Sequence, residues 1–174
     1  RIKERIFSFS RYIIAHIFFI VKEMERNKMK ICAIICEYNP FHHGPLYQLS
    51  AARELWGADA VVCLMSGNFV QRGEAAILEK HIRAKHALLA GADVVLELPA
   101  LFATSNAELF AKGAVKILSS VPAVSTLCFG AENADKTAFL QAAETLDEEP
   151  QSVSEKIKRL VGDGVSYARA RAEA

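Results

Sequence analysis

The sequence predicts an α/β fold, a doubly wound parallel sheet of the Rossmann-like type with helices on both faces. Four strand-like runs lie at 31–36, 60–65, 93–99 and 124–129, and the first is apolar throughout, without polar alternation, as is typical of a strand buried on both faces. Helical patterns separate these runs, so strands and helices alternate as in βαβ units with right-handed crossovers. Loops rich in glycine and polar residues follow the strands, at the edge where such sheets bind ligands.

The composition is that of a folded domain. A chain of 174 residues with 52% hydrophobic and 24% charged residues can bury one sizeable core. All four cysteines lie in apolar, strand-like runs, where cysteine usually behaves as a small buried hydrophobic residue: Cys32, Cys36, Cys63 and Cys128. Cys32 and Cys36 would lie roughly 13 Å apart along a strand, too far to share a zinc ion. We therefore expect reduced thiols, a cytoplasmic protein and no metal-ligating residues.

The charge is unevenly distributed along the chain. Residues 1–28 carry seven Lys and Arg against three Glu, a net charge of +4. The remaining residues carry fourteen Lys and Arg against seventeen acidic residues, a net charge of −3, which excludes a broad basic face for nucleic acid. The apolar run 13–21 is too short to span a bilayer, and no small-residue cleavage site follows it. We expect no membrane association, and we expect residues 1–28 to be an extension outside a domain of residues 29–174.

Apolar stripes and helix-end signals predict five helices. The first, over residues 46–55, has a core-facing stripe of Leu46, Leu49, Ala52 and Trp56. The second, over residues 77–89, is expected to turn Leu78, Ile82 and Leu89 toward the core and to place Lys80, Arg83, Lys85 and His86 on its other faces. The third is expected to be capped by Thr104 or Ser105 and to end near Leu118. Two more are expected over 137–146 and 154–160.

The stretch Glu-Tyr-Asn-Pro-Phe-His-His-Gly-Pro joins the first strand to the first helix. Pro40 ends the strand, Gly44 lets the backbone approach a ligand closely, and Pro45 suits the first helical position because it lacks an N–H. The free N–H groups of the helix and its dipole then favour a phosphate in the loop, within reach of His42 and His43. The alternative is that the two histidines are solvated residues of a surface loop.

Polar residues after the second and third strands are further candidates. Ser66 and Asn68 belong to a loop whose place at the ligand-binding edge favours function over a solvated turn. Lys80 and Arg83, on the helix that follows, are interpreted as part of a solvated helix face. Glu97 is an acid in an apolar strand, so it must be paired or functional, and an ion pair or cap is the more frequent explanation.

The loops resemble those of a known family. The run from His42 to Pro45 resembles the His-x-Gly-His signature of a nucleotidyltransferase superfamily, whose members transfer an adenylyl group from ATP and release pyrophosphate. A longer set of motifs is more specific: EYNPFH at 37–42, MSGNFVQRGE at 65–74, RAK at 83–85, ELP at 97–99, FAKGA at 110–114 and FGAE at 129–132. Together these motifs resemble the tRNA(Met) cytidine acetate ligase family, from Met29 to the end of the chain.

The resemblance implies a nucleotidyltransferase fold and a two-step reaction. ATP, with Mg²⁺, would activate acetate as acetyl-adenylate, and the acetyl group would pass to N4 of the wobble cytidine of elongator tRNA(Met). His42 would be the catalytic residue. The family's ATP-binding residues correspond here to Ile35, Cys36, Glu37, Tyr38, Asn39, Pro40, Phe41, His42, His43, Gly44, Pro45, Leu46, Tyr47 and Gln48, with Gly130 opposite them.

The sequence departs from the family pattern in two ways. Pro45 stands where the family has its second signature histidine, which removes a phosphate contact. The chain also stops at Ala174, whereas family members continue into a Ser/Thr-rich motif that completes the phosphate site. We therefore expect an amino-terminal fragment that is inactive alone. Its phosphate site would be incomplete, and most tRNA contacts would lie in the missing carboxyl-terminal region.

Two other functions fit the same residues. One is a nucleotide-binding module that has lost catalysis, and the other is a small-molecule nucleotidyltransferase of the same superfamily. A dinucleotide site for NAD is not expected, because no Gly-x-Gly-x-x-Gly turn follows the first strand.

Overall fold

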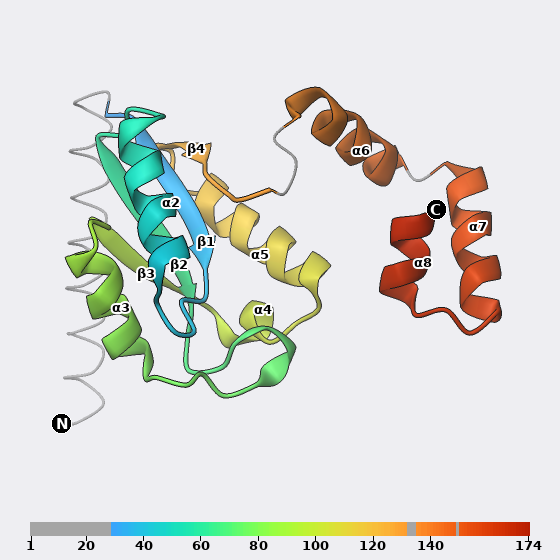
Figure 1. The fold of residues 1–174 in the computed structure, drawn as a ribbon, viewed down its shortest axis with the longest axis horizontal. Helices are drawn as coiled ribbons and strands as arrows, with labels where there is room; N and C mark the ends of the chain where they lie inside the picture. Colours follow the sequence, from blue (N-terminus) through green and yellow to red (C-terminus); the bar gives the residue numbers. More distant parts are fainter. Residues whose placement is uncertain (1–28, 132–134, 149) are drawn as a thin grey trace. The chain divides into compact units, whose positions relative to one another are not determined.

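The computed structural model describes residues 29–131, 135–148 and 150–174, which form two compact units (Figure 1). One unit ends at Gly130, and the other runs from Ala131 to Ala174. The expected extension, residues 1–28, lies outside the described residues.

The first unit is built on a four-stranded parallel sheet. Its strands are β1 (Ile31–Cys36), β2 (Ala60–Ser66), β3 (Val94–Leu98) and β4 (Val124–Leu127), in the order β3-β2-β1-β4. The strand order reverses between β1 and β4, which is the switch point of a doubly wound sheet. The predicted fold class is therefore confirmed, and the loops after β1 and β4 meet at the ligand-binding edge.

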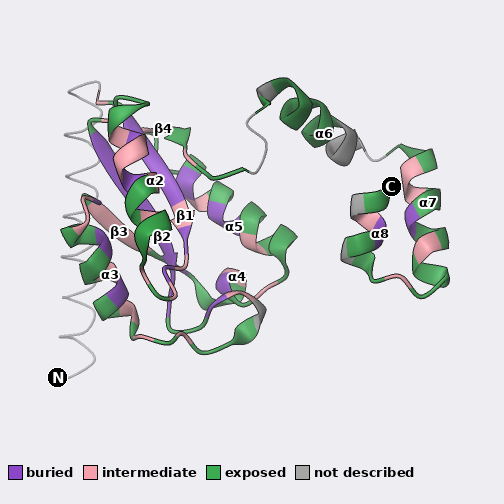
Figure 2. Cartoon of the chain, viewed as in Figure 1, coloured by how far each residue is buried: buried purple, intermediate pink, exposed green. Residues whose placement is uncertain are grey.

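Helices cover both faces of this sheet (Figure 1). The helices α2 (His43–Glu54) and α3 (Lys80–Leu89) contribute Leu49 and Ala87 to a core with Ile34 of β1. The helices α4 (Ala100–Ala103) and α5 (Ala107–Ser119) contribute Ala103 and Ala114 to a second core, with Ala33 of β1. Because successive residues of β1 enter opposite cores, nearly the whole strand is buried (Figure 2).

Helix α2 begins earlier than the sequence predicted. Its first residue is His43, so Pro45 occupies the third helical position and the expectation that it is first was wrong. Leu49 and Ala52 are buried as expected, but Leu46 is 40% exposed and Trp56 is 66% exposed. Trp56 lies beyond the helix end, in a turn that Gly57 closes with a φ of 61°, so it cannot continue the buried stripe.

Helix α3 differs more from its prediction. It begins at Lys80 rather than at residue 77. The Lys80 amide donates a hydrogen bond of 3.3 Å to the side-chain oxygen of Asn68. The helix turns Arg83 and Ala87 inward, while Ile82 is 42% and Leu89 is 77% exposed. The predicted orientation of α3 was therefore wrong, because an arginine rather than the larger apolar residues takes the core position.

The cap of α5 also differs from the expectation. Asn106 caps the helix by accepting a hydrogen bond from the Leu109 amide at 2.9 Å. The hydroxyls of Thr104 and Ser105 instead donate to carbonyl oxygens within the short helix α4, at 2.8 and 2.6 Å. These two residues end α4 and leave the next residue to start α5.

The second unit consists of α6 (Lys136–Glu148), α7 (Gln151–Gly162) and α8 (Tyr167–Glu173). The first two were predicted with shorter bounds, and α8 was not predicted. Ile157 and Ala170 are buried in α7 and α8, and the Lys156 ammonium donates to the Glu173 carbonyl at 2.6 Å. No helix among the described residues of the chain has the length and apolar character needed to cross a membrane.

Candidate nucleotide site

The loop after β1 is anchored by a buried tyrosine. Tyr38 is only 5% exposed, its hydroxyl lies 3.3 Å from the Cys63 sulfur, and its ring meets that of Phe41 edge-on at 4.9 Å between centroids. Burial, together with the neighbouring Cys36 thiol, raises the Tyr38 pKa far above its usual range. The Tyr38 φ of 50° lies in the left-handed region, which costs of order 1–3 kcal/mol and persists only where the surroundings hold it. The buried ring thus sets the path of the residues that follow.

His42 caps helix α2 with its own ring. The backbone of His42 is extended, and Nδ1 accepts a hydrogen bond from the Gly44 amide at 3.1 Å. Since Nδ1 is the acceptor, a neutral ring carries its proton on Nε2, which is left as a donor. A Cβ built on Gly44 would lie 2.9 Å from Cε1 of His42. Gly44 therefore has no side chain because the His42 imidazole lies against its backbone. This requirement holds whether or not a ligand also approaches the loop.

The helix start offers fewer amide donors than the sequence suggested. The Gly44 amide is taken by His42, and Pro45 has no N–H. Within the described part of the chain, the His43 amide has no hydrogen-bond partner. The positive end of the α2 dipole remains, but one amide and one imidazole replace the expected array of donors.

A buried arginine lies beneath the site. Arg83 is 0% exposed, and its guanidinium donates to three carbonyl oxygens: Leu78 at 2.9 Å, Glu37 at 2.5 Å, and Gly67. Burial lowers the Arg83 pKa. The interpretation of Arg83 as a solvated residue was wrong, because its five donors fit carbonyl groups at the ends of β1 and β2.

Lys80 and Glu97 form an ion pair at the same edge of the sheet. The Lys80 ammonium lies 2.7 Å from Oε2 and 2.9 Å from Oε1 of Glu97, with side chains 30% and 52% exposed. The expected pairing of Glu97 is thus confirmed, and the solvated reading of Lys80 was wrong. The Glu97 carboxylate packs against Gly67, where a Cβ would collide with Oε1.

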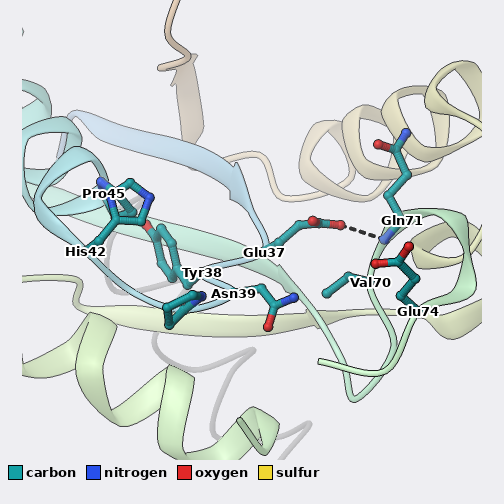
Figure 3. Close-up of a pocket in the computed structure, with 9 residues that line it drawn as sticks. Glu37, Tyr38, Asn39, His42, Pro45, Val70, Gln71 and Glu74 are labelled. Atoms are coloured by element: carbon teal, nitrogen blue, oxygen red, sulfur yellow. Dashed lines mark hydrogen bonds between the residues drawn. The ribbon is translucent and has the colours of Figure 1, made fainter. Parts of the chain in front are cut away.

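Two hydrogen bonds join the loop after β1 to the loop after β2, and Figure 3 draws the one between Glu37 and Gln71. Oε1 of Glu37 accepts from the Gln71 amide at 2.7 Å, with the Ser66 hydroxyl at 3.5 Å. Oδ1 of Asn39 accepts from the Ile77 amide at 2.7 Å. Ser66 is 0% exposed, so it supports Glu37 rather than facing a ligand. The two loops enclose a pocket of about 340 Å³ lined by Glu37, Tyr38, Asn39, Pro40, His42, Pro45, Val70, Gln71 and Glu74.

The other predicted nucleotide-site residues lie around this loop. Ile35 and Cys36 end β1 within the cores, where burial raises the Cys36 pKa and keeps the thiol protonated. The Tyr47 side chain is 70% exposed on α2. Gln48 reaches across the switch point, where its amide donates to the Cys128 carbonyl at 3.2 Å. Gly130 follows, so the structure brings α2 and the end of β4 together.

No three His, Cys, Asp or Glu side chains of the described residues are grouped so as to hold a metal ion. All four cysteines are free, and three of them are buried as predicted.

The doubly wound sheet, with a strand-loop-helix unit at its switch point, defines an α/β fold of the nucleotide-binding type. The model of the HIGH Nucleotidyl Transferase family matches residues 29–174, and the chain belongs to this family. It is 49% identical over 146 residues to a tRNA(Met) cytidine acetate ligase of Acetivibrio thermocellus, covering 84% of this chain and 35% of the relative. The corresponding enzyme of Clostridium tetani is 47% identical over 146 residues, covering 84% of this chain and 36% of the relative.

Solved structures agree with these sequence relatives. The crystal structure of Thermotoga maritima TmcAL bound with alpha-thio ATP has a TM-score of 0.76 and 44% sequence identity, covering 82% of this chain and 34% of that one. Its apo form gives the same TM-score and identity. The chain thus spans about a third of the length of the relatives it matches.

Proposed function

We propose that this chain is the ATP-binding, acetate-activating domain of a tRNA(Met) cytidine acetate ligase. The observation that carries the proposal is His42, which caps α2 through Nδ1 and leaves Nε2 as a donor at the switch point of the sheet. The names of the relatives and the ATP analogue bound to the Thermotoga maritima protein support the choice of substrates.

In the first step an acetate oxygen attacks the α-phosphorus of ATP, and pyrophosphate leaves. The nucleotide lies against residues 35–48, with Gly130 on the other side of the switch point. His42 donates from Nε2 to a phosphoryl oxygen as negative charge grows there, and the α2 dipole favours the same charge. Mg²⁺ would be held mainly by the phosphates, where it neutralises the leaving pyrophosphate.

In the second step the acetyl group passes to N4 of the wobble cytidine, and AMP leaves. Residues 29–174 carry a net charge of −3, so this part of the protein offers little general attraction for RNA. We place most tRNA contacts in the part of the ligase that lies outside the third matched by this chain. We place the protein in the cytoplasm. The isolated chain should therefore not acetylate tRNA.

The test is exchange of labelled pyrophosphate into ATP. It is run on this chain and on a chimera that joins the chain to the part of Thermotoga maritima TmcAL outside the matched 34%. Exchange that requires acetate supports the proposal. ATP binding without exchange supports a binding module, and exchange that requires a nucleotide monophosphate or phosphopantetheine supports a small-molecule nucleotidyltransferase. Tighter binding of NAD than of ATP in calorimetry would refute the ATP site.

A further inference from the structure

The pocket between the two loops has a charge that does not suit a triphosphate. Its volume, about 340 Å³, is within the range of roughly 300–1,000 Å³ typical of small-molecule sites. Two carboxylates, from Glu37 and Glu74, belong to its lining, and the described lining residues include no Lys or Arg. Like charges would repel polyphosphate from the end that holds these carboxylates, whereas His42 lies at the other end (Figure 3). The acidic end suits a group that donates hydrogen bonds.

The two carboxylates are not equivalent. Oε1 of Glu37 is committed to the Gln71 amide at 2.7 Å, so this side chain holds the loops together. The Glu74 side chain has no hydrogen bond or ion pair within the described residues, although the Glu74 carbonyl accepts from the Val70 amide at 2.9 Å. A bridge between Phe69 and Ala75 closes this loop, which fixes the Glu74 backbone. Among the described residues, Glu74 is thus an unpaired acceptor on a loop whose backbone is held in place.

Asn39 supplies a donor in the same pocket. Its Oδ1 accepts from the Ile77 amide at 2.7 Å, which fixes the orientation of the side-chain amide. Its NH₂ group has no partner within the described residues and belongs to a pocket-lining side chain. A carboxylate acceptor and an amide donor together match cytosine, which presents an N4 amine as donor and N3 and O2 as acceptors. Uracil presents a donor at N3 and an acceptor at O4, which is the reverse of cytosine at these two positions.

We infer that this pocket receives the cytosine base that accepts the acetyl group, an inference that rests on the proposed function. Asn39 donates to N3 or O2, and Glu74 accepts a hydrogen bond from the N4 amine. When N4 attacks the acetyl carbonyl carbon, a C–N bond forms and the bond from that carbon to the AMP oxygen breaks, its electron pair leaving on AMP. The proton lost by N4 passes to the Glu74 carboxylate. His42, at the opposite end of the pocket, places the phosphoryl group beside this base.

The binding part of the inference can be tested on the chain itself. Cytidine and uridine are titrated separately into labelled protein, and backbone amide shifts are followed by NMR. Cytidine should shift the amides of residues 70–74 and that of Asn39, and uridine should bind at least about fivefold more weakly, as expected for one mismatched hydrogen-bond pattern. Glu74→Gln should remove the preference, whereas Glu79→Gln, an exposed acid outside the pocket, should keep it. Equal shifts by both nucleosides, or none near this loop, would overturn the inference.

The catalytic part is tested in the chimera by competition between two acceptors. Hydroxylamine traps activated acetate as acetohydroxamate without needing a base or a recognition pocket, and tRNA yields acetylcytidine. Glu74→Gln should lower the ratio of acetylcytidine to acetohydroxamate by about 100-fold, as for loss of a general base, and Glu74→Asp should restore part of it. Glu79→Gln should leave the ratio unchanged. An unchanged ratio in Glu74→Gln would refute the role of Glu74, whereas absence of acetohydroxamate in the wild type would refute the proposed function instead.

Discussion

The guanidinium of Arg83 donates to the backbone carbonyl of Glu37 at a distance of 2.5 Å. Glu37 is the first residue after β1, so this contact joins the buried face of α3 to the start of the nucleotide loop. The same side chain reaches Gly67, the first residue after β2. One fully buried cation therefore sets the relative position of the two loops that form the pocket.

Replacing Arg83 should destabilise the fold. Arg83→Met would leave the carbonyl groups of Leu78, Glu37 and Gly67 buried without donors, at about 1–3 kcal/mol for each group that finds no water. We expect a total loss of about 3 kcal/mol or more, measured as a lower urea midpoint. Lys85→Met, an exposed change on the same helix, is the control and should shift the midpoint by less than about 0.5 kcal/mol. Equal losses in both variants would contradict the assigned role.

Gly44→Ala should separate activity from stability. The added Cβ would approach Cε1 of His42 at 2.9 Å and displace the ring, which has room to move because it is partly exposed. Pyrophosphate exchange by the chimera should fall by about tenfold or more, since a misplaced donor loses much of its effect on the transition state. The thermal midpoint should match that of Gly162→Ala, where the new Cβ has no neighbour within 4 Å. Exchange at the wild-type rate would show that the ring position does not matter.

Pro45 allows the backbone donor and the imidazole to be tested separately. Pro45→Ala restores an N–H in the first turn of α2, and Pro45→His adds the family's second histidine as well. One preorganised donor to a developing oxyanion is worth about 3–4 kcal/mol, or two to three decades in rate. Pro45→His in the chimera should raise acetate-dependent exchange far more than it changes ATP affinity. If Pro45→Ala gives the whole gain, the missing amide and not the missing imidazole limits the reaction.

The burial of Cys32 should make stability fall in alkali. Burial raises its pKa from 9.0 to about 11, so the folded state keeps a proton that the unfolded state loses. The contribution is present below pH 9 and is lost between pH 9 and pH 11, amounting to about 2 kcal/mol. Urea midpoints measured from pH 8 to pH 11 should fall less steeply in Cys32→Ala. Ile34→Val, a similar loss of buried volume without a titrating group, should retain the wild-type slope.

The sheet could be predicted because its strands carry a purely local signal. Residues 31–36 and 60–65 are apolar throughout, and that pattern alone indicates burial on both faces. The helix termini were less predictable than the strands. Neighbouring residues can have equal capping propensity, and only their hydrogen-bond partners in the folded structure decide which one caps the helix. Thr104 and Ser105 are good caps in isolation, but both hydroxyls bond back into α4, and Asn106 caps α5 instead.

Part of the site could be predicted because part of its sequence signal is local. The strand-loop-helix pattern around His42 is local, and the structure places its residues at the switch point as expected. The role of Arg83 depends on carbonyl groups 46 and 16 residues away in the sequence, which no periodic pattern reveals. An arginine among alanines on a helix looks solvated until those partners are known.

We propose that Nε2 of His42 donates to the phosphoryl group, and replacing His42 with serine tests this role most directly. His42→Ser keeps an oxygen able to cap α2 but has no donor where Nε2 lies, so the fold should survive. In the chimera, acetate-dependent pyrophosphate exchange should fall by about 10²–10³-fold in His42→Ser. His81→Ser, an exposed histidine of α3 outside the pocket, should exchange at the wild-type rate. Exchange by His42→Ser at the wild-type rate, with ATP still bound, would contradict this role of Nε2.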